Sequence, residues 1–199
     1  MIQRYDRYTT DSGDIRRLHQ EDLCQITSTV SAQKYTQDGG PDFAALFQAV
    51  QQYTRPAALY QNELVRRLLF NLIIGNQDAH GKNFSFLHTS AGIQLAPAYD
   101  LVCTLVYPEL SERFAMPIAS ASRIEELDTD ALLQFQQHTG ISLKRQASVL
   151  KRFITTAVNS LHEEAERVKE EAFDDTHPVL DRITQLAQRH GDMLQRWLE

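Results

Sequence analysis

The residues best suited to chemistry lie between Gly75 and Asn83, where the sequence reads Gly-Asn-Gln-Asp-Ala-His-Gly-Lys-Asn. Asp78 and Asn83 are separated by four residues, which is the interval between the catalytic base and a metal-holding amide in phosphoryl-transfer loops. The Asp would accept or orient the proton of an attacking hydroxyl, and the Asn would hold Mg²⁺ beside the triphosphate. The spacing alone is weak evidence, because both residue types are common in loops. The alternative is that Asp78 caps a turn and His80 packs beneath it.

A magnesium ion beside a triphosphate needs a further acidic ligand, and Asp100 follows Asn83 in the sequence. Residues 84–87 and 93–95 are largely apolar, and the Ala91-Gly92 pair between them favours a turn. We therefore expect a small β-hairpin that returns the chain and brings Asp100 beside Asn83.

An apolar helix is expected over residues 58–74, directly before this polar loop. Its apolar residues recur at the spacing of one helix face, and burial of that face would fix the loop that begins at Gly75. The face would comprise Leu64, Val65, Leu68, Leu69, Leu72 and Ile73.

The remaining patterns predict a mainly α-helical fold with a few short β-strands. Helices are expected over residues 42–53, 128–138, 143–171 and 177–198, and a short helix ending near Ile26. Short strands are expected over 2–8 and 114–118. The acidic run 163–175 is typical of a solvated face and turn. His190 falls on the apolar stripe of the last helix, where a core histidine is expected rather than a ligand.

Composition places the chain among ordinary globular proteins. Of its 199 residues 42% are hydrophobic and 23% charged, and the net charge is −6. An acidic surface of this kind offers no general attraction for nucleic acid. Cys24 and Cys103 stand among apolar neighbours without metal-ligand spacing, which predicts buried free thiols. With no signal-peptide or membrane-span pattern, we expect a soluble, cytoplasmic protein.

In several ordered motifs the chain resembles the C-terminal, helical lobe of the HipA family of serine/threonine kinases. These kinases are the toxins of HipA/HipB-type toxin–antitoxin systems. The resemblance implies a protein-kinase-like C-terminal lobe, with a hinge strand over residues 1–8 and a single helical domain over 9–199. The segments that carry it are Arg4-Tyr5-Asp6-Arg7, Leu18 to Gln25, Lys34-Tyr35 with Asp38-Gly39-Gly40-Pro41, Asp78 to Ser85, and Leu95-x-Pro97-x-Tyr99-Asp100-Leu101.

The resemblance also implies roles for individual residues. Asp78 would be the catalytic base, and Asn83 and Asp100 would be the ligands of Mg²⁺. Lys82 would balance charge on the transferring phosphoryl group. The remaining residues would belong to the ATP site: the backbone around Gln3 and Tyr5 would hydrogen-bond adenine, Asp6 would reach the ribose, and His80 and Tyr99 would lie near the nucleotide. Gln20, Glu21 and Asp22 are expected to brace the loop without a catalytic role.

One departure from the family pattern concerns a preceding lobe. Protein kinases use a Gly-rich loop and a strand Lys to hold the phosphates, whereas this sequence has no Gly-rich loop and no Lys before Lys34. Charge-assisted hydrogen bonds contribute about 1.5–3 kcal/mol each. Without them we expect roughly a thousandfold weaker ATP binding, so that the chain alone is nearly inactive. A separate N-terminal-lobe polypeptide, a truncated kinase and a lobe retained for binding all fit this pattern.

The leading interpretation is transfer of phosphate from ATP to a protein Ser/Thr hydroxyl, and the resemblance suggests an aminoacyl-tRNA synthetase as the substrate. Small-molecule kinases can share the Asp and Asn arrangement, but the long motifs favour the HipA family. The alternative is a non-catalytic interaction protein that binds a HipB-like antitoxin or a complementary lobe. The family can contact operator DNA through basic residues of this lobe. Residues 118–126 here contain one Arg and two Glu, so we expect no direct DNA binding.

Overall fold

The computed structural model describes residues 4–171 and 176–199. These residues form two compact units, one comprising the chain up to Leu64 together with His80–Asp100, and one comprising Val65–Ala79 together with Leu101–Glu199. The chain thus passes between the units within the long helix α3 (Ala57–Ile74), again before His80, and again after Asp100. No helix in the described residues is long and apolar enough to cross a bilayer.

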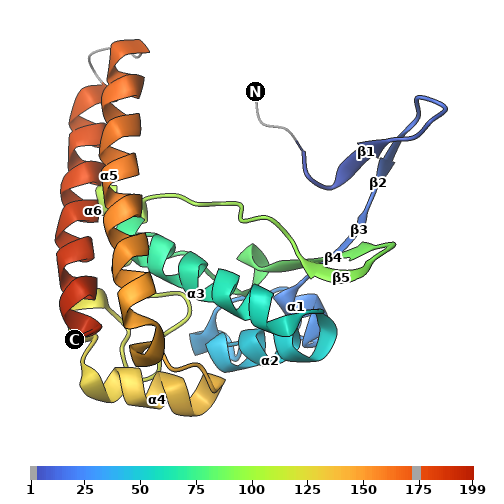
Figure 1. Cartoon of the computed structure of the whole chain (residues 1–199), viewed down its shortest axis with the longest axis horizontal. Helices are drawn as coiled ribbons and strands as arrows, with labels where there is room; N and C mark the ends of the chain where they lie inside the picture. Colours follow the sequence, from blue (N-terminus) through green and yellow to red (C-terminus); the bar gives the residue numbers. More distant parts are fainter. Residues whose placement is uncertain (1–3, 172–175) are drawn as a thin grey trace. The chain divides into compact units, whose positions relative to one another are not determined.

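The first unit contains the short strands, two whole helices and the first part of α3 (Figure 1). Strands β1 (Arg7–Thr9) and β2 (Ile15–Arg17) form an antiparallel pair, and a separate antiparallel sheet has the order β3-β4-β5. Strand β3 (His19–Asp22) pairs with β4 (Ser85–Thr89), which forms a hairpin with β5 (Gly92–Leu95). The predicted hairpin is therefore confirmed. It lies beside a core that includes Leu23, Leu46, Phe47 and Phe86.

The helices of the first unit begin at side-chain caps. Asp22 accepts a hydrogen bond from the Gln25 N–H at the start of α1 (Leu23–Ile26), and Asp42 accepts one from the Ala45 N–H at the start of α2 (Phe43–Tyr53). Such caps satisfy amide groups that have no partner within the helix. The predicted helix over 42–53 is confirmed, as is the short helix ending at Ile26.

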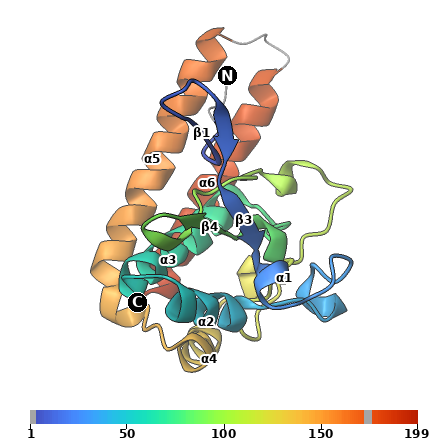
Figure 2. The ribbon, with the colours of Figure 1, turned by 90° about the vertical axis from the view of Figure 1, so that its right-hand side faces the viewer.

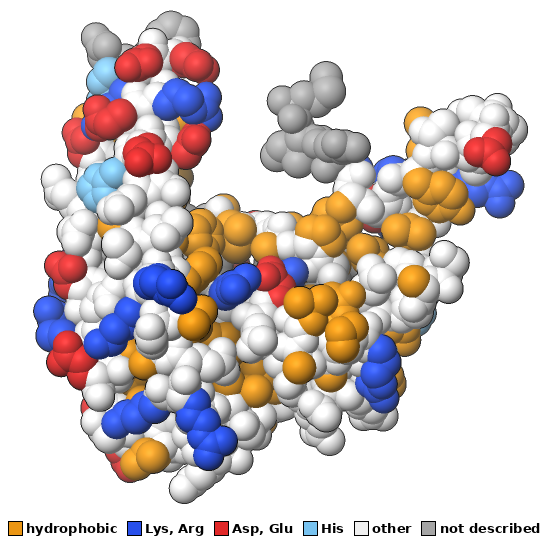
Figure 3. All heavy atoms as spheres, in the orientation of Figure 1, with side chains coloured by type: hydrophobic (Ala, Val, Ile, Leu, Met, Phe, Trp, Pro, Cys, Tyr) orange, Lys and Arg blue, Asp and Glu red, His pale blue; other side chains and the backbone are white. Residues whose placement is uncertain are grey.

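The second unit is helical, and its elements agree with three predicted helices. Helices α5 (Ala147–Glu171) and α6 (His177–Trp197) contact each other and run side by side (Figures 1 and 2). Helix α4 (Thr129–Thr139) begins at the cap Asp128. Acidic side chains lie on the surface near the end of α5 (Figure 3). Five of the predicted acidic run are exposed, as expected for a solvated face: Glu163, Glu164, Glu166, Glu170 and Glu171. The rest of that run, residues 172–175, lies outside the described residues.

Short 3₁₀ turns connect these elements. They are η1 (Thr36–Asp38), η2 (Gly81–Asn83), η3 (Thr104–Val106), η4 (Ile124–Glu126) and η5 (Lys144–Gln146).

Three local predictions were wrong. The strand expected over 2–8 starts only at Arg7, because residues 5 and 6 form a turn, and residues 1–3 lie outside the described chain. The strand expected over 114–118 is a loop, whose backbone N–H groups at Phe114 and Ala115 bond to the carbonyls of Ser122 and Gln77. Cys24 is buried as predicted, but Cys103 is only partly buried.

Candidate functional site

Asn83 and Asp100 lie together in the first unit. The Asn83 side chain, at the end of η2, donates a hydrogen bond from Nδ2 to Asp100 Oδ2 at 2.7 Å. The β4–β5 hairpin between them returns the chain to produce this contact. The backbone of Asp100 has φ 56°, in the left-handed region that Asp tolerates better than most residues. Strained backbone of this kind is often found at functional sites, and here it sits at a predicted metal ligand.

The loop that carries Asp78 belongs to the second unit and is fixed by a buried polar network. Asn76 Nδ2 donates to Asn71 Oδ1 at 2.9 Å, and the Gln77 N–H donates to Thr104 Oγ1 at 2.8 Å. The Asp78 N–H in turn donates to Asn76 Oδ1 at 3.2 Å. These three donors are satisfied, which holds the loop in place. The buried Gln77 Oε1 has no hydrogen-bond partner among the described residues. Asp78 itself is half-buried.

His80 is buried and is held by residues that follow α1. Lys34 Nζ lies 2.8 Å from His80 Nε2, and the Tyr35 ring meets the imidazole edge-on at 5.4 Å between centroids. An ammonium group can only donate, so His80 Nε2 is the acceptor in this contact. The His80 N–H also donates to Asn83 Oδ1 at 3.0 Å, which orients the Asn83 amide.

The first unit contains a cavity of about 450 Å³. Its volume lies in the range of small-ligand sites. Four of its lining residues are predicted site residues, namely Tyr5, Asp6, Lys82 and Tyr99. Sequence reasoning assigned no ligand contact to the others: Arg4, Arg17, Gln20, Asp22, Gln25 and Ser85.

Tyr99 forms the aromatic wall of this cavity. Its ring stacks on that of Tyr5 at 6.2 Å between centroids and 30° between planes. Its hydroxyl lies 2.6 Å from Ser85 Oγ and donates to the carbonyl of Lys82. Burial raises the pKa of Tyr99 to about 12, so the phenol keeps its proton at neutral pH. The Tyr99 hydroxyl therefore ties the end of the hairpin to the loop that carries Lys82 and Asn83.

Asp6 is almost fully buried and is surrounded by arginines. Arg4 donates two hydrogen bonds of 2.8 Å to the two carboxylate oxygens, and Arg7 and Arg17 lie 3.6 Å from Oδ2. The hydrogen bonds from Arg4 hold the pKa of the Asp6 carboxyl below its ordinary value. Asp6 thus has a clear structural role, which the sequence did not predict. A ribose contact stays a prediction.

Lys82 and Gln3 are the remaining predicted site residues. Lys82 lines the cavity, and its ammonium group donates to Ser31 Oγ. Gln3 lies outside the described residues. Of the residues expected to brace the loop, Asp22 caps α1 and Gln20 pairs with Leu87 across the sheet.

Comparison with solved structures identifies the class of fold. The chain superimposes with a TM-score of 0.77 on a chain of the Shewanella oneidensis toxin–antitoxin complex of HipA, HipB and operator DNA, at 24% sequence identity. The match covers 98% of this chain and 47% of that one. The fold is therefore a HipA-like, kinase-like C-terminal lobe.

Sequence comparison gives the family. The family model for the HipA-like C-terminal domain matches residues 1–168, and the chain belongs to this family. It is 38% identical over 174 residues to the Sinorhizobium fredii protein named "Putative kinase Y4mE", and 31% identical over 147 residues to the serine/threonine-protein kinase toxin HipA of Shewanella oneidensis. These matches cover 87% and 68% of this chain, but only 40% and 33% of the two relatives.

Proposed function

We propose that the chain is the helical part of an ATP- and Mg²⁺-dependent serine/threonine protein kinase of the HipA kind. The observation that supports this most directly is the 2.7 Å contact between Asn83 and Asp100. It joins two oxygen-bearing side chains that the family motifs single out as ligands of one ion, and it does so next to a cavity of ligand size.

The donor set at this contact fits Mg²⁺. An amide oxygen has two lone pairs, and the His80 N–H takes one of those on Asn83 Oδ1. An ionised carboxylate has about four acceptor positions, of which Asn83 takes one at Asp100. Mg²⁺ in kinases is bound by one or two such groups together with waters and phosphate oxygens. When bound, the ion neutralises charge that develops on the phosphates.

The chain's own residues would perform the remaining steps. Asp78, on its braced loop, would orient the attacking Ser or Thr hydroxyl and accept its proton. Lys82 would lie near the phosphates and balance their charge. In the cavity, the backbone around Gln3 and Tyr5 would bind adenine, and Asp6 would reach the ribose. His80 and Tyr99 would keep the loop and the hairpin end in place around the nucleotide.

The partners follow from the relatives. The solved HipA structure is a complex with HipB and operator DNA, so we infer a HipB-like antitoxin as a partner of this chain. A protein hydroxyl is the inferred acceptor, with an aminoacyl-tRNA synthetase as the first substrate to try. The single helical lobe over 9–199, with its hinge at 1–8, belongs to the same proposal.

The decisive experiment measures transfer of labelled γ-phosphate from ATP to a candidate aminoacyl-tRNA synthetase. The chain is assayed alone and together with the polypeptide encoded directly upstream. We expect Mg²⁺-dependent transfer in the mixture, and a loss of about a hundredfold or more in Asp78→Asn, because a positioned base contributes 10²–10⁴-fold. Asp100→Asn should need a higher Mg²⁺ concentration to reach the same rate, because an anionic ligand of the ion is lost.

The matched control is Asp130→Asn, which changes an exposed carboxylate on α4. It should leave transfer unchanged. Transfer that survives Asp78→Asn would contradict the assignment of the base. Stable binding of the upstream polypeptide or of a HipB-like protein, without any transfer, would favour the non-catalytic interaction protein instead.

A further inference from the structure

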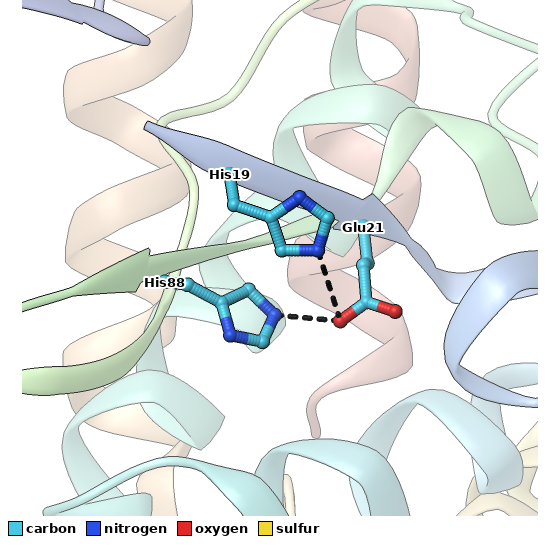
Figure 4. Close-up of side chains that lie close together, drawn as sticks. All are labelled: His19, Glu21 and His88. Carbon is cyan, nitrogen blue, oxygen red and sulfur yellow. Dashed lines mark hydrogen bonds and ion pairs between the residues drawn. The ribbon is translucent and has the colours of Figure 1, made fainter. Parts of the chain in front are cut away.

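A second group of potential metal ligands lies on the paired strands β3 and β4 and includes neither Asn83 nor Asp100. His19 stands directly opposite His88 in the antiparallel register, and Glu21 follows His19 by two residues on β3. Side chains two apart on a strand share one face, and directly paired residues share it across the ladder. All three side chains therefore project from the same face of the sheet, as Figure 4 shows.

Their donor atoms converge. Glu21 Oε2 lies 2.6 Å from His88 Nε2 and 3.9 Å from His19 Nε2, and one donor atom from each residue lies within 4.8 Å of the other two. The two imidazole rings are 4.7 Å apart between centroids, tilted by 46°. In a tetrahedral zinc site, metal–ligand bonds of about 2.0–2.2 Å place donor atoms roughly 3.3–3.5 Å apart. The observed distances lie on either side of this value, so small side-chain rotations suffice.

A simple ion pair accounts for only part of this arrangement. The Glu21–His88 contact joins one carboxylate oxygen to one imidazole nitrogen. His19 is held beside the same oxygen although two thirds of its side chain is exposed. Two imidazoles and one carboxylate are the ligands of many zinc centres, and imidazole favours zinc-like ions over Mg²⁺ or Ca²⁺.

We propose that His19, Glu21 and His88 form a binding site for one divalent transition-metal ion of the zinc class, with water in the open fourth position. The ion joins β3 to β4. Gln20 and Asp22 alternate with the ligands along β3 and line the cavity from the other face of the strand. The metal therefore supports the strand that forms one wall of that cavity.

The test uses the whole 199-residue chain, freed of metal with a chelator and titrated calorimetrically with ZnCl₂. We expect one tight equivalent in the wild type and at least a tenfold loss of affinity in His19→Asn and in His88→Asn. At a zinc concentration a hundred times Kd, the wild-type Tm should rise by about 5–10 °C. Co²⁺ in place of Zn²⁺ should give visible absorption bands that both variants lose.

His19→Asn is the most informative variant, because the exposed His19 side chain can be replaced without removing the Glu21–His88 contact. The matched control is His138→Asn, an exposed histidine on α4, which should bind zinc like the wild type. Asp100→Asn should also keep the zinc site, which separates this proposal from that of a magnesium-dependent kinase. Equal zinc affinity in the wild type and in His19→Asn, or an equal loss in His138→Asn, would overturn the proposal.

Discussion

At the scale of single residues, His190 shows how an ionisable side chain is kept inside the second unit. It is 2% exposed, and its Nδ1 donates to the carbonyl of Leu72 at 2.8 Å. Burial lowers the pKa of this imidazole, because a charge is poorly solvated there. The sequence predicted a core histidine at this position, and the prediction is confirmed.

The lowered pKa of His190 makes stability depend on pH. In the unfolded chain a histidine takes up a proton near pH 6.5, whereas folded His190 takes it up only at lower pH. The unfolded state therefore binds more protons between these two values, and stability falls as the pH drops below about 6.5. His190→Asn retains a donor for the Leu72 carbonyl but cannot titrate, so its stability should fall less between pH 7 and 5. Urea unfolding across this range measures the difference.

The control for this prediction is His138→Asn, which replaces an exposed histidine on α4. Its pH profile should follow that of the wild type. An unfolding free energy that declines as steeply in His190→Asn as in the wild type would refute the assignment.

At the scale of elements, the packing of α5 against α6 depends on the close approach of Gly191 to Val158. A Cβ atom added at Gly191 would lie 2.8 Å from Val158 Cγ2, which is closer than packed side chains allow. Val158 is buried and branched at Cβ, so it cannot easily rotate away. A glycine within a helix usually lowers stability, and here it allows the two helices to meet.

The expected effect of Gly191→Ala is a balance between two terms. Ala favours the helix by about 1 kcal/mol over Gly, while overpacking costs about 1–3 kcal/mol, so we expect a net loss near 1 kcal/mol. In a Val158→Ala background the clash is removed, and Gly191→Ala should then stabilise the chain. Chemical denaturation of the wild type, the two single variants and the double variant gives this coupling. A loss of the same size in both backgrounds would show that the Val158 contact is not its cause.

Some elements could be predicted from the sequence and others could not. The helices α2 to α6 were predictable because their apolar residues recur at helical spacing and capping Asp residues precede α2 and α4. Strands β2 and β3 were not, since Ile15–Arg17 and His19–Asp22 are mostly polar and carry no alternating apolar pattern. The Asn83–Asp100 contact was predictable because a recognisable hairpin separates the two residues. The cluster on β3 and β4 was not, because it depends on pairing between distant segments.

At the scale of the whole molecule, the charge distribution argues against DNA binding by the chain alone. The net charge is −6. The only arginine in the stretch 118–126 is Arg123, and it is paired with Glu112 at 2.8 Å. Glu125 in the same stretch is paired with Arg189 at 3.1 Å. The stretch therefore presents no surplus of positive charge to phosphates.

We accordingly expect the purified chain to bind duplex DNA more weakly than the roughly 10⁻⁴ M limit of ordinary non-specific binding at physiological salt. Fluorescence anisotropy with a labelled duplex measures this, at several salt concentrations. Micromolar binding that strengthens as salt is removed would contradict the expectation. In a complex with an antitoxin, DNA contacts can come from the partner, so the comparison needs the chain by itself.

The lining of the cavity differs in sign from the rest of the protein. Arg4, Arg17 and Lys82 contribute three cationic groups to it, whereas Asp6 and Asp22 contribute two anionic ones. A phosphorylated small molecule would therefore meet a lining with more positive than negative groups, on a protein whose net charge is −6. Such a lining favours the approach of anionic ligands, and added salt weakens this preference.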